Sequence, residues 1–277
     1  MSYLYETHLH TVQGSSCGVS RGRDYVKRYR DSGFTGIIVT DHFYNGNTTV
    51  DRNLPWKRWV EQFARGYEEA RNEGAKVGLD VFFGWEETFK GDDYLVYGLD
   101  KDWLLAHPES ARWSRKEQFH AVRAAGGCVV QAHPFRAAYY IRTIHLAPRL
   151  VDAVEIANAC NDPDWDSLAS EYALRAGLPV TAGSDIHDAG QFDGGGIFGV
   201  YLSEKLETIG DYAAAIRNRA VAGLKIPPGR GVFHGCENPA LPVDIRDEND
   251  RGVLDARGTR LGFWDYMARK KAVPACG

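Results

Sequence analysis

Histidine and carboxylate side chains recur in five short segments of the sequence, and each segment closes a run of strand-forming residues. The side chains belong to His8, His10, Asp41, His42, Glu86, His133, Asp185 and His187. Side chains two residues apart on a strand point to the same face, so His8 and His10 can direct both imidazoles at one point. Because imidazole and carboxylate groups are metal ligands, this pattern predicts a metal centre.

A His-x-His pair in a strand can also be structural, a half-buried pair that hydrogen-bonds to its neighbours. The position of all five segments decides between the two interpretations. In a parallel α/β barrel the carboxyl ends of the strands gather on one face, where active sites are built. This many ligands exceeds the four of a closed structural site, so we predict a cluster of two or three metal ions with open positions.

Short apolar runs alternate with amphipathic stretches along the chain. Strands are predicted at residues 3–10, 34–42, 78–87, 93–99, 128–134, 151–159, 178–187 and 196–202. Helices are predicted at residues 22–33, 56–74, 114–127, 165–177 and 209–220. The alternation predicts an α/β fold with parallel strands and covering helices, and the number of strands favours a barrel over an open sheet.

The alternating pattern ends at about Ile226. Residues 226–277 are rich in Pro, Gly and charge, and one helix is predicted within them near residues 263–271. We therefore expect a barrel domain at residues 1–225 and an irregular C-terminal extension at residues 226–277 that packs on or near it.

Composition narrows the class of protein. The net charge of −4 argues against a long nucleic acid as the partner. Five scattered cysteines without a Cys-x-x-Cys pair favour a reducing compartment, so we expect the cytoplasm. No apolar run approaches the roughly 20 residues that a membrane-spanning helix needs. We expect neither a membrane anchor nor a signal peptide.

Five motifs in this order resemble the signature segments of the PHP (polymerase and histidinol phosphatase) superfamily of metal-dependent phosphoesterases. They are His-Leu-His-Thr at 8–11, Thr-Asp-His at 40–42, Gly-Trp-Glu at 84–86, Ala-His-Pro at 132–134 and Gly-Ser-Asp-Ile-His at 183–187. The resemblance covers roughly residues 4–203. It implies a distorted (β/α)7 TIM-like barrel with a cluster of up to three ions such as zinc, manganese or iron.

The resemblance also implies how the ions are held. The ligands of one ion would be His8, His10, Glu86 and Asp185. Glu86 resembles the bridging carboxylate of the family, and His133 would help to hold the second ion. His42 and His187 would belong to the third ion. Glu86 is preferred to Glu87 because it fits the Gly-x-Glu pattern of the family, and Glu87 would point the other way.

Two residues depart from the pattern of the family. Cys17 stands where a ligand of the third ion is expected, and it is either a thiolate ligand or a small loop residue. Leu95 stands where members with a full second site carry a histidine, so the second ion would have a thinner shell and the centre could be dinuclear. Asp41 is expected to orient a ligand and not to bind metal itself.

Phosphate recognition calls for arginine. Arg136, just after His133, is the best candidate for bidentate contacts, although an exposed arginine at a helix start is the alternative interpretation. Arg21, Arg23 and Arg230 are weaker candidates. Glu155 and Asn158 close another predicted strand and could touch the site.

These features predict a metal-dependent phosphoesterase that acts on a small phosphorylated metabolite or nucleotide. Activated water would attack phosphorus, and Asp185, His187 or His42 would give a proton to the leaving alcohol. Monoesters and short or cyclic phosphodiesters both stay open as substrates. The alternatives are a hydrolase of C–N or C–O bonds, whose usual bridging lysine ends no strand here, and a non-catalytic PHP module, which would usually lose several ligands.

Overall fold

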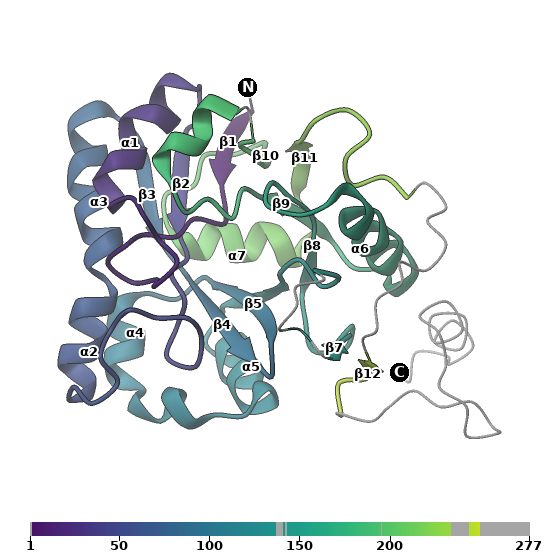
Figure 1. Cartoon of the computed structure of the whole chain (residues 1–277), viewed down its shortest axis with the longest axis horizontal. Helices are drawn as coiled ribbons and strands as arrows, with labels where there is room; N and C mark the ends of the chain where they lie inside the picture. Colours follow the sequence, from purple (N-terminus) through teal and green to yellow (C-terminus); the bar gives the residue numbers. More distant parts are fainter. Residues whose placement is uncertain (1, 137–140, 142, 195, 234–243, 250–277) are drawn as a thin grey trace.

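The computed structural model describes residues 2–136, 141, 143–194, 196–233 and 244–249 (Figure 1). Two five-stranded sheets form its main body. The first has the spatial order β11 (Val221–Lys225), β10 (Gly199–Leu202), β1 (Tyr3–Glu6), β2 (Gly36–Val39) and β3 (Asp80–Phe83). The second has the order β4 (Trp85–Phe89), β5 (Asp92–Tyr97), β6 (Cys128–Gln131), β8 (Ala153–Asn158) and β9 (Val180–Gly183). A two-stranded sheet pairs β7 (Thr143–His145) with β12 (Asp244–Arg246).

The strands are partly parallel and partly antiparallel. β1, β2 and β3 run parallel, as do β6, β8 and β9, whereas β10 is antiparallel to β1 and β5 is antiparallel to both of its neighbours. The expected α/β class is confirmed, but the expectation of uniformly parallel strands is wrong. β4 and β5 instead form a hairpin whose turn residues Lys90 and Gly91 both have positive φ.

Closure of the strands into a (β/α)7 barrel is not shown by the described residues. Outside the ladders, the two sheets are linked through the isolated parallel bridges Leu9–Ile186 and His42–Glu86. The predicted strand at 78–87 divides at Gly84, where the chain leaves the first sheet and enters the second. A Cβ atom at Gly84 would lie 3.0 Å from the Val96 carbonyl oxygen, so the close passage of the backbone favours glycine.

Seven α-helices and two short 3-10 helices lie among the described residues. They are α1 (Gly22–Asp31), α2 (Trp56–Phe63), α3 (Arg65–Val77), α4 (Lys101–Ala106), η1 (Pro108–Arg112), α5 (Arg115–Ala124), α6 (Pro163–Ala176), η2 (Ala189–Gly194) and α7 (Ile209–Arg217). Figure 1 shows α1 and α3 side by side along the first sheet, and α6 beside β8 of the second. The helix predicted at 56–74 is two helices that meet at Ala64, and α4 was not predicted.

Local sequence explains where several helices begin and end. Ser114 and Glu117 form a reciprocal capping box at the start of α5. α6 begins with Pro163 after an Asp162 cap and ends at Gly177, whose φ of 66° suits the left-handed cap position. The stripe of aromatic residues on α2 is packing: Trp59 and Phe63 are buried against Phe43.

The described part of the C-terminal extension continues from β11 to residue 233 and resumes with β12 beside β7. The helix predicted near residues 263–271 lies outside the described residues. Among the helices that the structure describes, none is long and apolar enough to cross a membrane.

Candidate metal centre

The predicted ligands converge at one edge of the two sheets. His8, His42, His133 and Asp185 each follow the carboxyl end of a strand, namely β1, β2, β6 and β9. Glu86 was expected at the end of a strand, but it lies near the start of β4 because the chain divides at Gly84. The parallel bridge to His42 brings Glu86 to the end of β2 and so into the same group.

Glu86 lies at the centre of the cluster. Its Oε1 atom is 3.2 Å from Nε2 of His8 and 3.3 Å from Nε2 of His133. Its Oε2 atom is 2.8 Å from Nδ1 of His42 and 3.4 Å from Nε2 of His10. A carboxylate that faces four imidazoles with its two oxygens has the position of a bridging ligand.

Asp185 lies on the other side of His8 and His10. Its Oδ1 atom is 3.1 Å from Nε2 of His10 and 3.4 Å from Nε2 of His8, and its Oδ2 atom pairs with Arg136. His187 stacks on the ring of His10 at 4.5 Å between centroids and is 23 % exposed, so it marks the open side of the cluster.

Four groups of three side chains have one potential ligand atom from each residue within 4.8 Å of the other two. The groups are His8, His10 and Asp185; His8, Glu86 and His133; His10, His42 and His187; and His42, Glu86 and Asp93. The first three agree with the predicted positions for three ions, although His8 and His10 each belong to two groups. Asp93 was not predicted.

The donor atoms fit divalent cations. Nε2 of His8 and Nε2 of His10 lie 3.1 Å apart, which requires a proton or a metal cation beside them. His42 Nδ1 and Glu86 Oε2 are buried and lie 2.8 Å apart, although their geometry is not that of a hydrogen bond. An imidazole nitrogen and a carboxylate oxygen this close together fit two ligands of one cation.

Hydrogen bonds beyond the ligands orient the imidazoles. Nδ1 of His8 donates to Glu155 Oε1 at 2.9 Å, and Nδ1 of His10 donates to Ser15 Oγ at 3.0 Å. Ser15 Oγ in turn donates to Asp41 Oδ1 at 2.7 Å. Both histidines therefore turn Nε2 toward the cluster, and Asp41 lies where an orienting residue was expected.

Glu6, which no motif singled out, joins two of the strands that lead to predicted ligands. Its buried carboxylate accepts hydrogen bonds from the backbone N–H groups of His8 and Ser184, each at 2.9 Å, and from Tyr29 Oη at 2.6 Å. The end of β1 is thereby held against the end of β9, next to Asp185.

Two predicted ligands have unusual backbone conformations. His133 has φ of 26° and Asp185 has φ of 53°, in the left-handed region that non-glycine residues seldom adopt. Such strain persists where surrounding contacts enforce it, and it concentrates at functional sites.

The charges of the cluster favour bound cations. Burial raises the pKa of Glu86, but the neighbouring His42 and His8 outweigh burial and hold it well below the usual range. Burial lowers the pKa of His8, yet the charges of Glu155, Asp185 and Glu86 raise it well above the ordinary value. A site that draws protons onto a buried histidine in this way would exchange them for metal.

Cys17 lies at the open side of the cluster. Burial raises the pKa of its thiol, but hydrogen bonds with His187 and His42 outweigh burial and lower it to about 6. A thiolate at this place is available to metal. The exposed Cys160 reaches the same region, with its thiol 3.2 Å from the Asp185 carbonyl oxygen.

Arg136 is only 18 % exposed, and its contacts point into the site. Nε donates to Asn161 Oδ1 at 2.9 Å, and Nη2 donates to Asn158 Oδ1 at 3.1 Å and to Asp185. Burial lowers the pKa of the guanidinium, but the charge of Asp185 outweighs burial, so the group stays charged. This geometry does not match an exposed arginine at a helix start.

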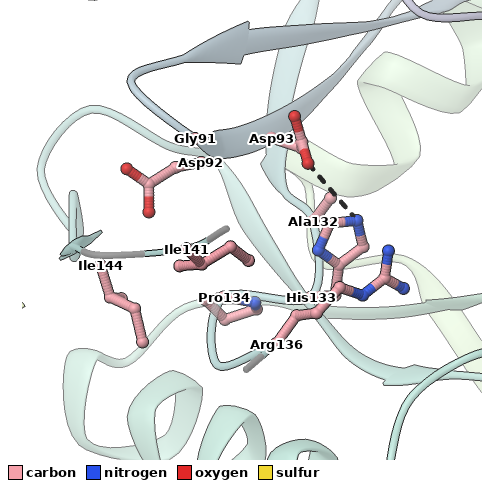
Figure 2. Close-up of a pocket in the computed structure, with 9 residues that line it drawn as sticks. All are labelled: Gly91, Asp92, Asp93, Ala132, His133, Pro134, Arg136, Ile141 and Ile144. Atoms are coloured by element: carbon pink, nitrogen blue, oxygen red, sulfur yellow. Dashed lines mark ion pairs between the residues drawn. The ribbon is translucent and has the colours of Figure 1, made fainter. Parts of the chain in front are cut away.

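A small pocket opens next to the cluster. Figure 2 shows Asp93, His133 and Arg136 on one side of it and the apolar residues Ile141 and Ile144 on the other. The pocket is small, about 10 Å³, which is room for roughly one water molecule, and the carboxylate of Asp92 also lines it.

The weaker arginine candidates do not face the cluster. Arg21 and Arg23 are more than half exposed and pair with Glu69. Arg230 pairs with Asp166 at 2.8 Å and donates to two backbone carbonyl groups. Glu87 is directed away from the cluster, toward Gln118, as expected.

Asp93 and Ser15 are site residues that the motifs missed. Asp93 is the second residue of the antiparallel strand β5, whose first residues lie at the edge where the parallel strands end. A Lys-Gly turn after β4 was the available signal for that hairpin. Ser15 is recognisable only through its contacts with Asp41 and His10.

No protein-family model matches the sequence, and neither does a curated protein. A solved two-domain protein from Bacteroides vulgatus that contains a predicted PHP-like metal-dependent phosphoesterase has 19% identity and a TM-score of 0.57. The match covers 79% of this chain and 64% of that one, so this chain spans less than two thirds of its length. PsfC from Pseudomonas syringae has 17% identity and a TM-score of 0.52, over 79% of this chain and 94% of its own.

These similarities define the class of fold. The chain shares its fold with the solved protein that contains a predicted PHP-like metal-dependent phosphoesterase, and the resemblance inferred from the five motifs is confirmed at this level. At such low identity the comparison establishes the fold and leaves the chemistry to the residues of the site.

Proposed function

We propose that this chain is a metal-dependent phosphoesterase that hydrolyses a small phosphorylated metabolite or nucleotide, with a phosphomonoester as the preferred substrate. The observation that carries the proposal is the partly buried Arg136 guanidinium beside the His and carboxylate cluster. Two of its nitrogens are held by protein side chains, so the bidentate contact expected from the sequence is replaced by one nitrogen, free among the described residues, that suits an anionic oxygen.

Two or three divalent ions of zinc, manganese or iron would be the cofactors. The first position would use His8, His10, Glu86 and Asp185. Glu86 would bridge to the second position, where His133 is a ligand. His42, His187 and the Cys17 thiolate would form the third. We assign this centre to a proposed PHP barrel domain at residues 1–225, with the extension at 226–277 as a separate segment on or near it.

When bound, the ions would lower the pKa of water and polarise a phosphoryl oxygen. Arg136 would hold a second phosphoryl oxygen. Nε and Nη2 are engaged with Asn161, Asn158 and Asp185, and no partner for Nη1 is found among the described residues. Nη1 is therefore the group that can turn to substrate without loss of the contacts that fix the side chain.

The reaction needs attack by water on phosphorus, cleavage of the bond to the leaving oxygen, and a proton for that oxygen. Asp185, His187 and His42 are the proposed catalytic side chains. His187 is the most accessible of the three, and its Nδ1 donates to the Asp185 carbonyl oxygen at 2.7 Å, so its ring orientation is fixed. With Nδ1 held by that carbonyl group, Nε2 either gives the proton, in a centre of two ions, or binds the third ion, so His187 is the proposed proton donor of the two-ion centre.

Several features weigh against the alternatives. The central bridging position is taken by Glu86 and not by a lysine, unlike the usual hydrolases of C–N bonds. A non-catalytic module would be expected to lack several ligands, whereas the eight residues predicted from the sequence all lie at or beside the cluster. The free thiols of Cys17, Cys128 and Cys160 support the proposed cytoplasmic location.

The test uses His10→Ala and Asp185→Ala. Each variant should lose bound metal, measured by plasma mass spectrometry, and hydrolysis of a phosphomonoester should fall by at least about a thousandfold, equivalent to about 4 kcal/mol of transition-state stabilisation. Far-UV circular dichroism should stay near that of the wild type. His120→Ala, at an exposed position on α5, is the matched control and should keep metal and activity. Wild-type turnover in either cluster variant would contradict the proposal.

A further inference from the structure

Asp93 belongs to a strand whose direction brings it to the metal centre. β5 is antiparallel to β4 and β6, so its first residues lie at the edge where β6 ends and His133 follows. In the register of the hairpin, Asp93 lies opposite Thr88 and Leu95 lies opposite Glu86. Asp93 and Leu95 are two residues apart and share a face of the strand. This face is the one that carries Glu86.

The carboxylate of Asp93 is directed at the cluster. Its Oδ2 atom is 4.0 Å from Nε2 of His133, as Figure 2 shows. One of its oxygens lies within 4.8 Å of ligand atoms of both His42 and Glu86. The 4.0 Å separation from His133 exceeds a hydrogen bond and fits two donors that share one ion, since metal–ligand distances near 2 Å put ligand atoms about 3–4 Å apart.

The orientation of Asp93 is fixed from the other side. Thr88 Oγ1 donates to Oδ1 at 2.6 Å, and Thr88 lies directly across the hairpin. This hydrogen bond keeps Oδ1 on the side of Thr88, and Oδ2 faces His133. A carboxylate with one oxygen held by a hydroxyl and the other aimed at imidazole resembles a preorganised ligand.

We propose that Asp93 is a ligand of the second ion, together with Glu86 and His133. The inference rests on the proposed metal centre and deepens it. Leu95 cannot bind an ion, but Asp93 lies two residues earlier on the same face of β5. Asp93 would then supply the ligand that the second position otherwise lacks.

This ligand set gives the centre two chemically different positions. Two carboxylates and one imidazole make the second position rich in oxygen, which suits manganese or ferrous iron. His10, His42 and His187, with the nearby thiol of Cys17, make the third position rich in nitrogen and sulfur, which suits zinc. The protein should therefore bind different metals at the two positions when both are offered.

The experiment compares wild-type protein with Asp93→Asn and Asp93→His. Each is stripped of metal, equilibrated with manganese alone, zinc alone or an equimolar mixture, and analysed by plasma mass spectrometry. Asp93→Asn should lose one equivalent of manganese or bind it at least about tenfold more weakly. Removal of a residue that only hydrogen-bonds to a metal ligand already lowers metal affinity by about tenfold or more, so the loss of a ligand should have at least that effect. Asp93→His should keep this equivalent but exchange manganese for zinc in the mixture.

Glu87→Gln is the matched control, because Glu87 belongs to the same hairpin and faces Gln118. It should bind metals as the wild type does. Wild-type stoichiometry and selectivity in both Asp93 variants would overturn the inference, as would a wild-type protein that binds no metal. The outcome is independent of turnover: loss of the manganese equivalent in a protein without phosphoesterase activity would support Asp93 as a ligand and reject the proposed function alone.

Discussion

At the scale of single residues, hydrogen bonds to Nδ1 orient the imidazoles of His8 and His10 so that both Nε2 atoms face the proposed metal centre. Glu155 and Ser15 each accept from an Nδ1 atom, so the Nε2 atoms of His8 and His10 meet 3.1 Å apart. The motifs predicted the two histidines because strand periodicity alone puts them on one face. Ser15 and Asp93 could not be predicted in this way, since their roles depend on loop and strand partners that are distant in the sequence.

Cys17 tests whether the third position includes a thiolate. Cys17→Ser replaces a soft donor by a harder one of similar size, so zinc bound near His42 and His187 should be reduced by about one equivalent or weakened at least about tenfold. Zinc titration followed by plasma mass spectrometry measures this change. His120→Ala, at an exposed position on α5, is the control. If Cys17→Ser bound zinc as the wild type does, Cys17 would be a loop residue.

Glu87 should make the stability of the fold depend on pH. Burial raises the pKa of this carboxyl to about 8 in the folded protein, against an ordinary value of 4.5. The folded state then holds a proton that the unfolded state releases, so the free energy of unfolding should fall as pH rises from about 4.5 to about 8, by up to about 1.4 kcal/mol per pH unit.

Glu87→Gln removes the ionisable group, so its urea midpoint should fall less between pH 5 and pH 9 than that of the wild type. Measurements at the two pH values isolate the difference, because other titrating groups are shared by the two proteins. Parallel curves for the two proteins would show that Glu87 does not titrate in this range.

At the scale of elements, strand direction decides which residues reach the site. The sequence pattern predicted most of the strands, because apolar runs bounded by Gly, Asp and Pro are strong signals. It did not predict the direction of β5, which depends on the turn at Lys90 and Gly91. β7 and β12 have three residues each, too few for any periodicity to emerge.

The segment after β11 contributes to the site through Arg230. This guanidinium donates to the carbonyl oxygens of Asn158 and Asn161, at 2.9 and 2.6 Å. The side chains of the same two asparagines accept from Arg136. Arg230 is therefore a positioning residue, because it holds the loop that holds the proposed phosphate-binding arginine.

Arg230→Gln should raise KM for a phosphomonoester about tenfold, or about 1.4 kcal/mol, with less change in kcat and unchanged metal content. Steady-state kinetics and plasma mass spectrometry give the three quantities. Arg219→Gln is the control. Arg219 is exposed and donates a hydrogen bond to the carbonyl oxygen of Gly177, which lies outside the loop that holds Arg136. A variant with unchanged KM would remove Arg230 from the support of the site.

At the scale of the whole molecule, two sheets meet at the edge that carries the ligands. The five motifs predicted this convergence correctly, because ligands that follow strand ends gather wherever neighbouring strands share a direction. They could not establish how the two sheets are joined, because the bridges Leu9–Ile186 and His42–Glu86 pair residues far apart in the sequence, and closure into a barrel is not shown by the described residues.

The most direct test of the central claim is metal content and phosphoester hydrolysis on one purified sample of the wild-type protein. Plasma mass spectrometry gives the ions bound per chain, and a panel of phosphomonoesters with one generic phosphodiester gives the activity. We predict two or three divalent ions per chain and turnover that is fastest on a monoester. Bound metal without release of phosphate from any ester would contradict the proposed reaction, and a chain that binds no metal would contradict the metal centre itself.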